Sequence, residues 1–311
     1  MAQKLLVYQS LWAMERRSPD GREWPLEEKL TMIRDAGFDG AGVRFADYDY
    51  ANTVTGFLRA HNMSWQAQCY PQTVDDLKPI LEHVKELGAD HLNLQPDVRP
   101  YTVAECVPYI EDWLRLAEDA GITLHIETHR NRMTTELIFT LHLLDLFPDL
   151  RLTGDLSHYV VGREFWYPVS AEDHAMMHRI IDNCWGFHGR VASREQIQLQ
   201  LGFPQHQGWV EVFMGWWERG FRGWSKRAGP DATLTFLCEL GPPEYAMTGP
   251  EGYELSDRWE EAKDLKVSVR KLWARIEAEQ GQPPKGKKNI EAPCSQRGEG
   301  ASTANPSALA A

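Results

Sequence analysis

The sequence lacks the features that mark several large classes of protein. Its five cysteines are scattered and include no Cys-x-x-Cys pair, which argues against a disulfide scaffold and a zinc knuckle. No apolar run approaches the roughly 20 residues that a membrane-spanning helix needs. The first residues turn polar again too early for a signal peptide. We therefore expect a protein of a reducing, cytoplasmic compartment that has no membrane partner.

Positive charge is also scarce. Lysine and arginine together number 33 against 45 aspartates and glutamates, which gives a net charge of −12. General nucleic-acid binding needs a cationic surface that displaces counterions from phosphates, so we expect no nucleic-acid partner. The hydrophobic content of 42% is ordinary for a globular protein.

Two further absences exclude particular enzyme classes. No lysine occurs between Lys85 and Lys226, and none ends a predicted strand elsewhere. An aldolase of the Schiff-base type needs a buried amine borne on a strand, so that class is excluded. The chain also has no G-x-G-x-x-G or G-x-x-x-x-G-K-[ST] motif. This argues against a dinucleotide or P-loop fold and favours an unphosphorylated substrate.

Strand-like apolar segments alternate with longer amphipathic ones along most of the 311 residues. The expected strands are 5–11, 40–45, 65–70, 91–95, 123–127, 152–155, 185–188 and 234–239. The expected helices are 26–36, 51–60, 73–87, 102–120, 134–146, 171–182, 209–219 and 256–279. Eight β-then-α units predict the α/β class and a (β/α)₈ TIM barrel, in a single domain over residues 1–280.

Local chemistry marks several of the expected helix ends. Thr73, Thr102 and Ser256 each have an acidic residue three or four positions behind them, which is typical of N-capping. Glycines that tolerate a positive φ stand where three helices should end, at Gly37, Gly88 and Gly121.

Residues 281–311 differ from the rest in composition. They begin near Pro-Pro-Lys-Gly-Lys-Lys and continue with serine, alanine, glycine, threonine and asparagine. Such a segment cannot bury enough apolar surface to offset the loss of chain entropy. We therefore predict a disordered C-terminal tail.

Four carboxylate or imidazole side chains each close one of the last four expected strands. They are Glu127, Asp155, His188 and Glu239. In a TIM barrel the carboxyl ends of successive strands surround one mouth, where the chemistry takes place. One histidine and three carboxylates there predict a site for one divalent metal ion, Mn²⁺, Mg²⁺, Co²⁺ or Zn²⁺.

The two glutamates are also the expected catalytic pair. A divalent metal polarises a carbonyl or a pair of hydroxyls and stabilises an adjacent enediolate. Abstraction of the neighbouring proton needs a base, and a carboxylate can provide it. Glu127 and Glu239 would stand on strands five and eight, so one could remove a proton while the other delivers one.

Five further residues next to the strand ends are candidates for substrate binding. One lies three positions beyond the strand-six aspartate, in Asp-Leu-Ser-His, and another follows two positions after the strand-seven histidine. The latter could instead fix a ligating carboxylate. The others close strands two and four or follow the strand-five glutamate. In chain order they are Arg44, Gln95, His129, His158 and Arg190.

At these residues the chain resembles the xylose-isomerase-like TIM-barrel superfamily, in particular its sugar isomerase and epimerase branch. That branch carries Glu at the end of strand five, Asp-x-x-His at six, His at seven and Glu at eight. The resemblance covers about residues 1–280. It implies that the two glutamates are both metal ligands and acid/base residues, and that Arg190 contacts the site.

The resemblance implies a divalent-metal-dependent isomerase or epimerase acting on a sugar, keto-sugar or hydroxy-keto acid. The chain departs from the branch after the first glutamate, with Thr-His-Arg-Asn-Arg, and after the last, with Leu-Gly-Pro-Pro-Glu-Tyr. Relatives on this fold also include dehydratases and enzymes that open oxidised glycosides. A metal-dependent lyase, dehydratase or hydrolase acting on a keto-sugar or glycoside is therefore the alternative.

Two other classes remain open. An apurinic-site endonuclease of the same superfamily needs about three metal ions and extra histidines at strands two, three and seven. Here strand two ends in Arg44-Phe45 and strand three in Cys69-Tyr70, which argues against that class. A barrel that binds a small molecule without turnover has little need for two opposed glutamates. The expected partner is thus a small sugar-like substrate, and a homo-oligomer is left open.

Overall fold

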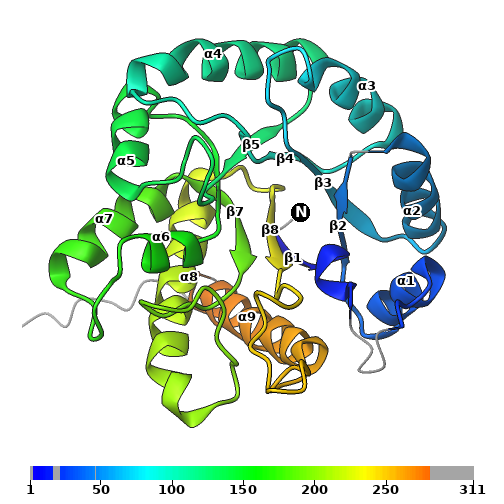
Figure 1. Cartoon of the computed structure of the whole chain (residues 1–311). Coiled ribbons are helices and arrows are strands. Elements are labelled where there is room, and N and C mark those ends of the chain that lie inside the picture. Colours follow the sequence, from blue (N-terminus) through cyan, green and yellow to red (C-terminus); the bar gives the residue numbers. More distant parts are fainter. Residues whose placement is uncertain (1–2, 17–21, 46, 281–311) are drawn as a thin grey trace, which may run out of the picture.

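A computed structural model describes residues 3–16, 22–45 and 47–280 of the chain. Eight parallel strands form a closed barrel in chain order, β1 to β8, and β8 pairs with β1 to complete it (Figure 1). The strands are Lys4–Ser10 (β1), Gly40–Arg44 (β2), Ser64–Cys69 (β3), Leu92–Leu94 (β4), Leu124–Glu127 (β5), Leu152–Gly154 (β6), Cys184–Gly189 (β7) and Thr233–Cys238 (β8). The predicted (β/α)₈ barrel is confirmed.

Helices surround the barrel on the outside (Figure 1). They are Leu26–Asp35 (α1), Tyr48–Ala60 (α2), Leu77–Leu87 (α3), Val103–Ala120 (α4), Leu137–Leu146 (α5), Ser157–Gly162 (α6), Ala171–Asp182 (α7), Gln207–Arg227 (α8) and Arg258–Gln280 (α9). Two short 3-10 helices are Trp12–Met14 (η1) and Pro204–His206 (η2). The predicted tail, 281–311, lies outside the described residues, so the division into a domain and a tail remains a prediction.

One expected helix start is correct and others are wrong. Thr102 caps α4 by accepting a hydrogen bond from the Glu105 backbone N–H. The helix expected to begin at residue 73 begins only at Leu77. The helix expected at residue 256 begins at Arg258, because the carboxylate of Asp257 accepts from the first backbone N–H groups. The six-residue helix α6 follows β6 where the sequence predicted only a connection.

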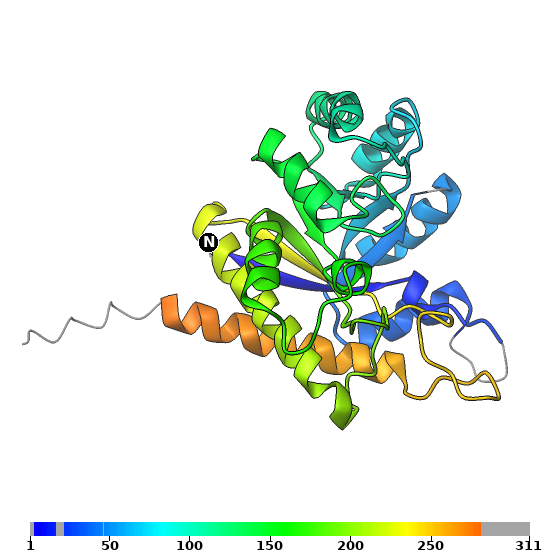
Figure 2. The ribbon, with the colours of Figure 1, turned by 60° about the vertical axis from the view of Figure 1, so that its left-hand side comes forward.

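The apolar core lies between the barrel and its helices. The ring of Trp217 on α8 packs edge-on against Phe236 of β8, with ring centroids 5.1 Å apart. Gly220 on α8 lies so close to the ring of Phe187 on β7 that a Cβ there would collide with it. Helices α8 and α9 lie side by side along one flank of the barrel (Figure 2).

The four described cysteines are buried and free. Among the described residues, no helix is both long and apolar enough to cross a bilayer.

The inside of the barrel is polar where it approaches the carboxyl ends of the strands. Side chains of Gln66 and Gln68 on β3 and of Asn93 on β4 are buried there. Alternate residues of a barrel strand face the interior, and a buried polar group needs a hydrogen-bond partner. The partners of these side chains are found at the mouth of the barrel.

Candidate metal and catalytic site

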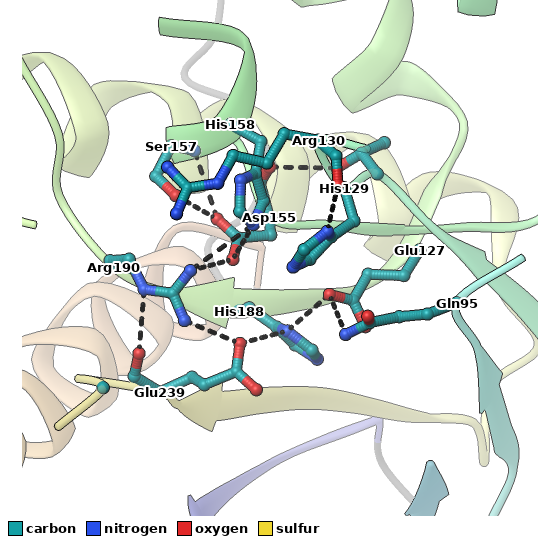
Figure 3. Close-up of polar contacts among 12 residues, drawn as sticks. Gln95, Glu127, His129, Arg130, Asp155, Ser157, His158, His188, Arg190 and Glu239 are labelled. Atoms are coloured by element: carbon teal, nitrogen blue, oxygen red, sulfur yellow. Dashed lines mark hydrogen bonds and ion pairs between the residues drawn. The ribbon is translucent and has the colours of Figure 1, made fainter. Parts of the chain in front are cut away.

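The four predicted ligands meet at the carboxyl ends of the last four strands. Glu127 ends β5, Asp155 and Glu239 directly follow β6 and β8, and His188 lies one residue before the end of β7. All four side chains are buried. Each offers one oxygen or nitrogen atom, and these four atoms lie within 4.8 Å of one another (Figure 3).

His188 stands between the two glutamates. Its Nδ1 lies 2.9 Å from Glu239 Oε2 and 3.6 Å from Glu127 Oε1. Its Nε2 lies 3.3 Å from the side-chain amide of Gln66. Burial alone would disfavour the imidazolium, but the carboxylates of Glu239 and Glu127 outweigh it and raise the pKa of His188 to about 9.

The two glutamates have different surroundings. Amide groups of Asn93 and Gln95 both donate to the Glu127 carboxylate, the latter over 2.9 Å. Burial nevertheless raises the pKa of Glu127. At Glu239 burial is outweighed by His188 and Arg190, and the pKa of this carboxyl is lowered. The pair is therefore split into one carboxyl that holds a proton more readily and one that stays ionised.

Arg190 connects two of the four ligands. Its Nη1 donates to Asp155 Oδ2 over 2.8 Å, and its Nη2 donates to Glu239 Oε2 over 3.1 Å. Its Nε donates to the backbone carbonyl of Glu239 over 3.0 Å. The other carboxylate oxygen of Asp155, Oδ1, accepts a hydrogen bond from the Ser157 hydroxyl over 2.5 Å. These contacts are those of a residue that orients ligating carboxylates.

Two histidines lie side by side behind Asp155. The rings of His129 and His158 have centroids 3.9 Å apart, and His158 Nε2 lies 3.4 Å from Asp155 Oδ2. Burial lowers the pKa of both imidazoles, so that both are neutral near pH 7. His158 is fully buried and reaches the site through Asp155 and Arg190.

A small pocket of about 230 Å³ opens onto this group. Four of the five residues expected to bind substrate line it, whereas His158 lies behind its wall. Arg44 is partly exposed and pairs with Glu15 over 3.5 Å. The lining residues are Trp12, Arg44, Tyr70, Gln95, His129, Arg132, Arg190, Glu239 and Tyr245. A larger hollow of about 720 Å³ lies between α7 and α8 and shares none of them.

Several residues of the site were not predicted from the sequence. Gln66 contacts His188, Gln68 Nε2 lies 3.5 Å from Glu239 Oε1, and Asn93 contacts Glu127. A signal was present, because polar residues recur with period two in β3 and at the end of β4, which is the pattern of a polar barrel interior. Trp12 and Tyr245, which form the pocket wall with ring centroids 5.1 Å apart, gave no such signal.

No protein-family model and no curated protein matches the sequence. Solved structures do match the fold. A xylose isomerase-like TIM barrel protein from Mycobacterium smegmatis, in complex with magnesium, has a TM-score of 0.56 at 11% identity, over 87% of this chain and 97% of that one. A sugar phosphate isomerase/epimerase from Parabacteroides distasonis has a TM-score of 0.53 at 10% identity, over 89% and 96%.

The fold also matches that of an endonuclease. An AP endonuclease of family 2 from Brucella melitensis has a TM-score of 0.50 at 14% identity, over 78% of this chain and 94% of that one. At such low identities the likeness concerns the backbone and not the reaction. Together with the closed eight-stranded barrel, these matches show that the chain has the fold of the xylose isomerase-like TIM-barrel proteins.

Proposed function

We propose that the protein is a divalent-metal-dependent isomerase or epimerase that acts on a sugar, keto-sugar or hydroxy-keto acid. One observation carries the proposal. Glu127, Asp155, His188 and Glu239 are buried at the barrel mouth with one donor atom from each within 4.8 Å of the others. Buried carboxylates gathered this closely need a cation to offset their mutual repulsion and their loss of hydration.

The donor set fits a divalent metal ion. Three carboxylates and one imidazole supply hard oxygen atoms and a borderline nitrogen, which suits Mg²⁺, Mn²⁺, Co²⁺ or Zn²⁺. Without a metal ion, Arg190 and the protonated imidazole of His188 supply two positive charges to the three carboxylates. When bound, a divalent ion would supply Lewis acidity that lowers the energy of negative charge developing on a substrate oxygen. The residues that would hold it are Glu127, Asp155, His188 and Glu239.

Glu127 and Glu239 are the proposed acid/base pair. One carboxylate takes the proton from the substrate carbon next to a carbonyl, which leaves an enediolate. The other carboxyl returns a proton to the neighbouring carbon in an isomerase, or to the same carbon in an epimerase. Without a metal ion, burial raises the pKa of Glu127, whereas His188 and Arg190 lower that of Glu239, so the two carboxyls differ in how readily they hold a proton.

The comparisons support this choice among the reactions known on the fold. The Parabacteroides protein is a sugar phosphate isomerase/epimerase, and the Mycobacterium structure is a magnesium complex. The net charge of −12 favours a small substrate over DNA.

A second candidate is a lyase, dehydratase or hydrolase that acts on a keto-sugar or glycoside through the same enolate chemistry. One observation favours it. A second hollow of about 500 Å³ shares Trp12 and Arg44 with the small pocket and is lined further by charged side chains and Tyr50. This leaves room for the second group of a glycoside beyond a sugar ring placed at the metal ligands.

The first experiment is metal analysis of the purified protein, followed by incubation with keto-sugars in deuterated solvent. An isomerase or epimerase should introduce deuterium and release an isomer, whereas a lyase should release water or an aglycone. Glu127→Gln and Glu239→Gln should each slow turnover by about 10²–10⁴-fold, and Glu172→Gln, an exposed carboxylate on α7, should not.

Two results would contradict the proposal. Turnover without any exchange of the substrate C–H would indicate a hydride shift in place of proton transfer. Cleavage of DNA at abasic sites, with no exchange in any sugar, would assign the barrel to the endonuclease reaction.

A further inference from the structure

The pocket above the metal ligands is cationic, although the protein as a whole is acidic. Three arginines, Arg44, Arg132 and Arg190, line it, and Glu239 is the one carboxylate among its lining residues in the described part of the chain. The whole sequence has a net charge of −12. A concave site with a charge opposite to that of its surroundings concentrates ligands of the complementary sign.

The carboxylates of the metal-ligand group balance the positive charge of Arg190 and of no other arginine at the pocket. Its guanidinium bridges Asp155 and Glu239. Three carboxylates, this one guanidinium and a divalent ion would sum to zero with a neutral His188. Any other cation at the pocket must therefore be balanced by a residue outside the ligand group or by the substrate.

The guanidinium of Arg132 has partners for only some of its hydrogen-bond donors. Its Nη1 lies 3.0 Å from Asp97 Oδ1 and donates to the backbone carbonyl of Asn131. Its Nε is buried and has no hydrogen-bond partner among the described residues. A buried donor without a partner is costly, and this one belongs to a side chain that lines the pocket.

Arg130 has no carboxylate partner within hydrogen-bonding range in the described part of the chain. Its guanidinium instead lies 5.0 Å from the centre of the Tyr245 ring, and Arg190 lies 4.8 Å from the same ring. Tyr245 is part of the pocket wall. Figure 3 shows the Arg130 side chain extending over the site toward Ser157 and Asp155.

We propose that the substrate carries an anionic oxygen group, a carboxylate or a phosphate, which is bound by Arg132 in the pocket, while Arg130, which lies against the Tyr245 ring, adds its charge to the attraction. This inference rests on the proposed function, because it places the rest of the substrate at the metal ligands. A guanidinium presents a planar fork of donors that matches such a group and stays charged when it is shielded from water. The absence of a Gly-rich phosphate turn and the small volume of the pocket favour the carboxylate.

The test is calorimetric binding to the full-length protein loaded with Mn²⁺, with three sugars of similar size as probes. They are a neutral ketohexose, the hexuronate with a carboxylate, and the ketohexose phosphate. We expect the hexuronate to bind at least tenfold more tightly than the neutral sugar, and this preference should shrink as the salt concentration rises.

Two substitutions test which arginines cause the preference for the anionic sugar. Arg132→Lys should reduce the affinity for the anionic sugar by about tenfold or more, as expected for a charge-assisted hydrogen bond. Arg130→Gln should reduce it less, by a factor that shrinks as the salt concentration rises. Neither substitution should affect the neutral sugar. Arg132→Lys keeps the positive charge but loses the fork with its Nε donor, and its melting temperature shows whether it folds. Arg115→Gln, exposed on α4, is the matched control.

The outcomes separate this inference from the proposed function. Equal affinity for neutral and anionic sugars, or an equal loss for both in the variants, overturns the inference even if deuterium exchange proves the isomerase. Binding of an anionic sugar through Arg132 without any exchange supports the inference and contradicts the isomerase. Preference for the phosphate alone supports the anionic group and identifies it as a phosphate.

Discussion

The guanidinium of Arg190 donates to Asp155 Oδ2 over 2.8 Å, although 35 positions separate the two residues in the chain. Both side chains are almost completely buried. The contact fixes the orientation of one proposed metal ligand, and the second amino group of the same guanidinium fixes Glu239 over 3.1 Å. A single side chain thus holds carboxylates from two different strand ends in one arrangement.

Asp155→Ala should remove most of the bound metal. It deletes a charged ligand, so the loss of affinity should be at least the 10–100-fold that is typical of changes in residues around a metal site. Metal content per protein, measured by mass spectrometry after dialysis, checks this. Asp149→Ala, an exposed residue before β6, is the control. Equal metal content in the wild type and the Asp155 variant would remove Asp155 from the ligand set.

Arg190→Lys should weaken metal binding by about 10–100-fold and leave the fold intact. A single ammonium group cannot span Asp155 and Glu239 as the guanidinium fork does. Titration with Mn²⁺ measures the effect, and Arg179→Lys, exposed on α7, serves as its control. An unchanged affinity would show that the two carboxylates hold their positions without this arginine.

Folding stability should fall as the pH drops below about 6.5. Burial lowers the pKa of His91 to about 3 and that of His125 well below its ordinary value. The unfolded chain therefore takes up protons on these residues at a pH where the folded chain cannot. The stability is fully present above the unfolded pKa, and each histidine then removes about 1.4 kcal/mol per pH unit, down to its folded pKa.

Urea unfolding between pH 8 and 5 measures this slope. His91→Leu should make the dependence shallower by the share of one histidine. Equal slopes for the wild type and the His91 variant would mean that this imidazole is protonated in the folded state.

Two glycines of α8 should respond in opposite ways to the same substitution. Gly215→Ala meets no atom within 4 Å and should stabilise the helix by about 0.5–1 kcal/mol. Gly220→Ala would drive a Cβ into the ring of Phe187 and should destabilise the protein by about 1–3 kcal/mol. Thermal unfolding of the two variants checks the pair. A stabilising Gly220→Ala would show that the Phe187 ring can move aside.

Removal of residues 281–311 should leave the melting temperature within roughly 2 °C of that of the full chain. Their composition cannot support a packed core, and α9 ends before them at Gln280. Thermal unfolding and size-exclusion chromatography of the truncated chain test this. A large drop, or a change of assembly state, would show that the segment docks or mediates association.

The sequence by itself was sufficient to predict the barrel and to select the four candidate ligands. Both rest on local periodicity. Each strand is recognisable as a short apolar run, and the residue that closes the run lies at the carboxyl end of the strand. The chain-order closure of parallel strands then brings Glu127, Asp155, His188 and Glu239 to one mouth, as found. Helix starts were less secure, because Asp257 and not Ser256 caps α9.

Only the tertiary structure decided what surrounds those four residues. Trp12 and Tyr245 come from opposite ends of the chain and meet because β8 pairs with β1. Asn93 reaches Glu127 across neighbouring strands. The loop that carries Arg130 has no periodicity, yet it brings this side chain to within 5.0 Å of the centre of the Tyr245 ring. Contacts between distant segments follow from how the barrel closes and how loops pack on it, and neither is encoded in the order of nearby residues.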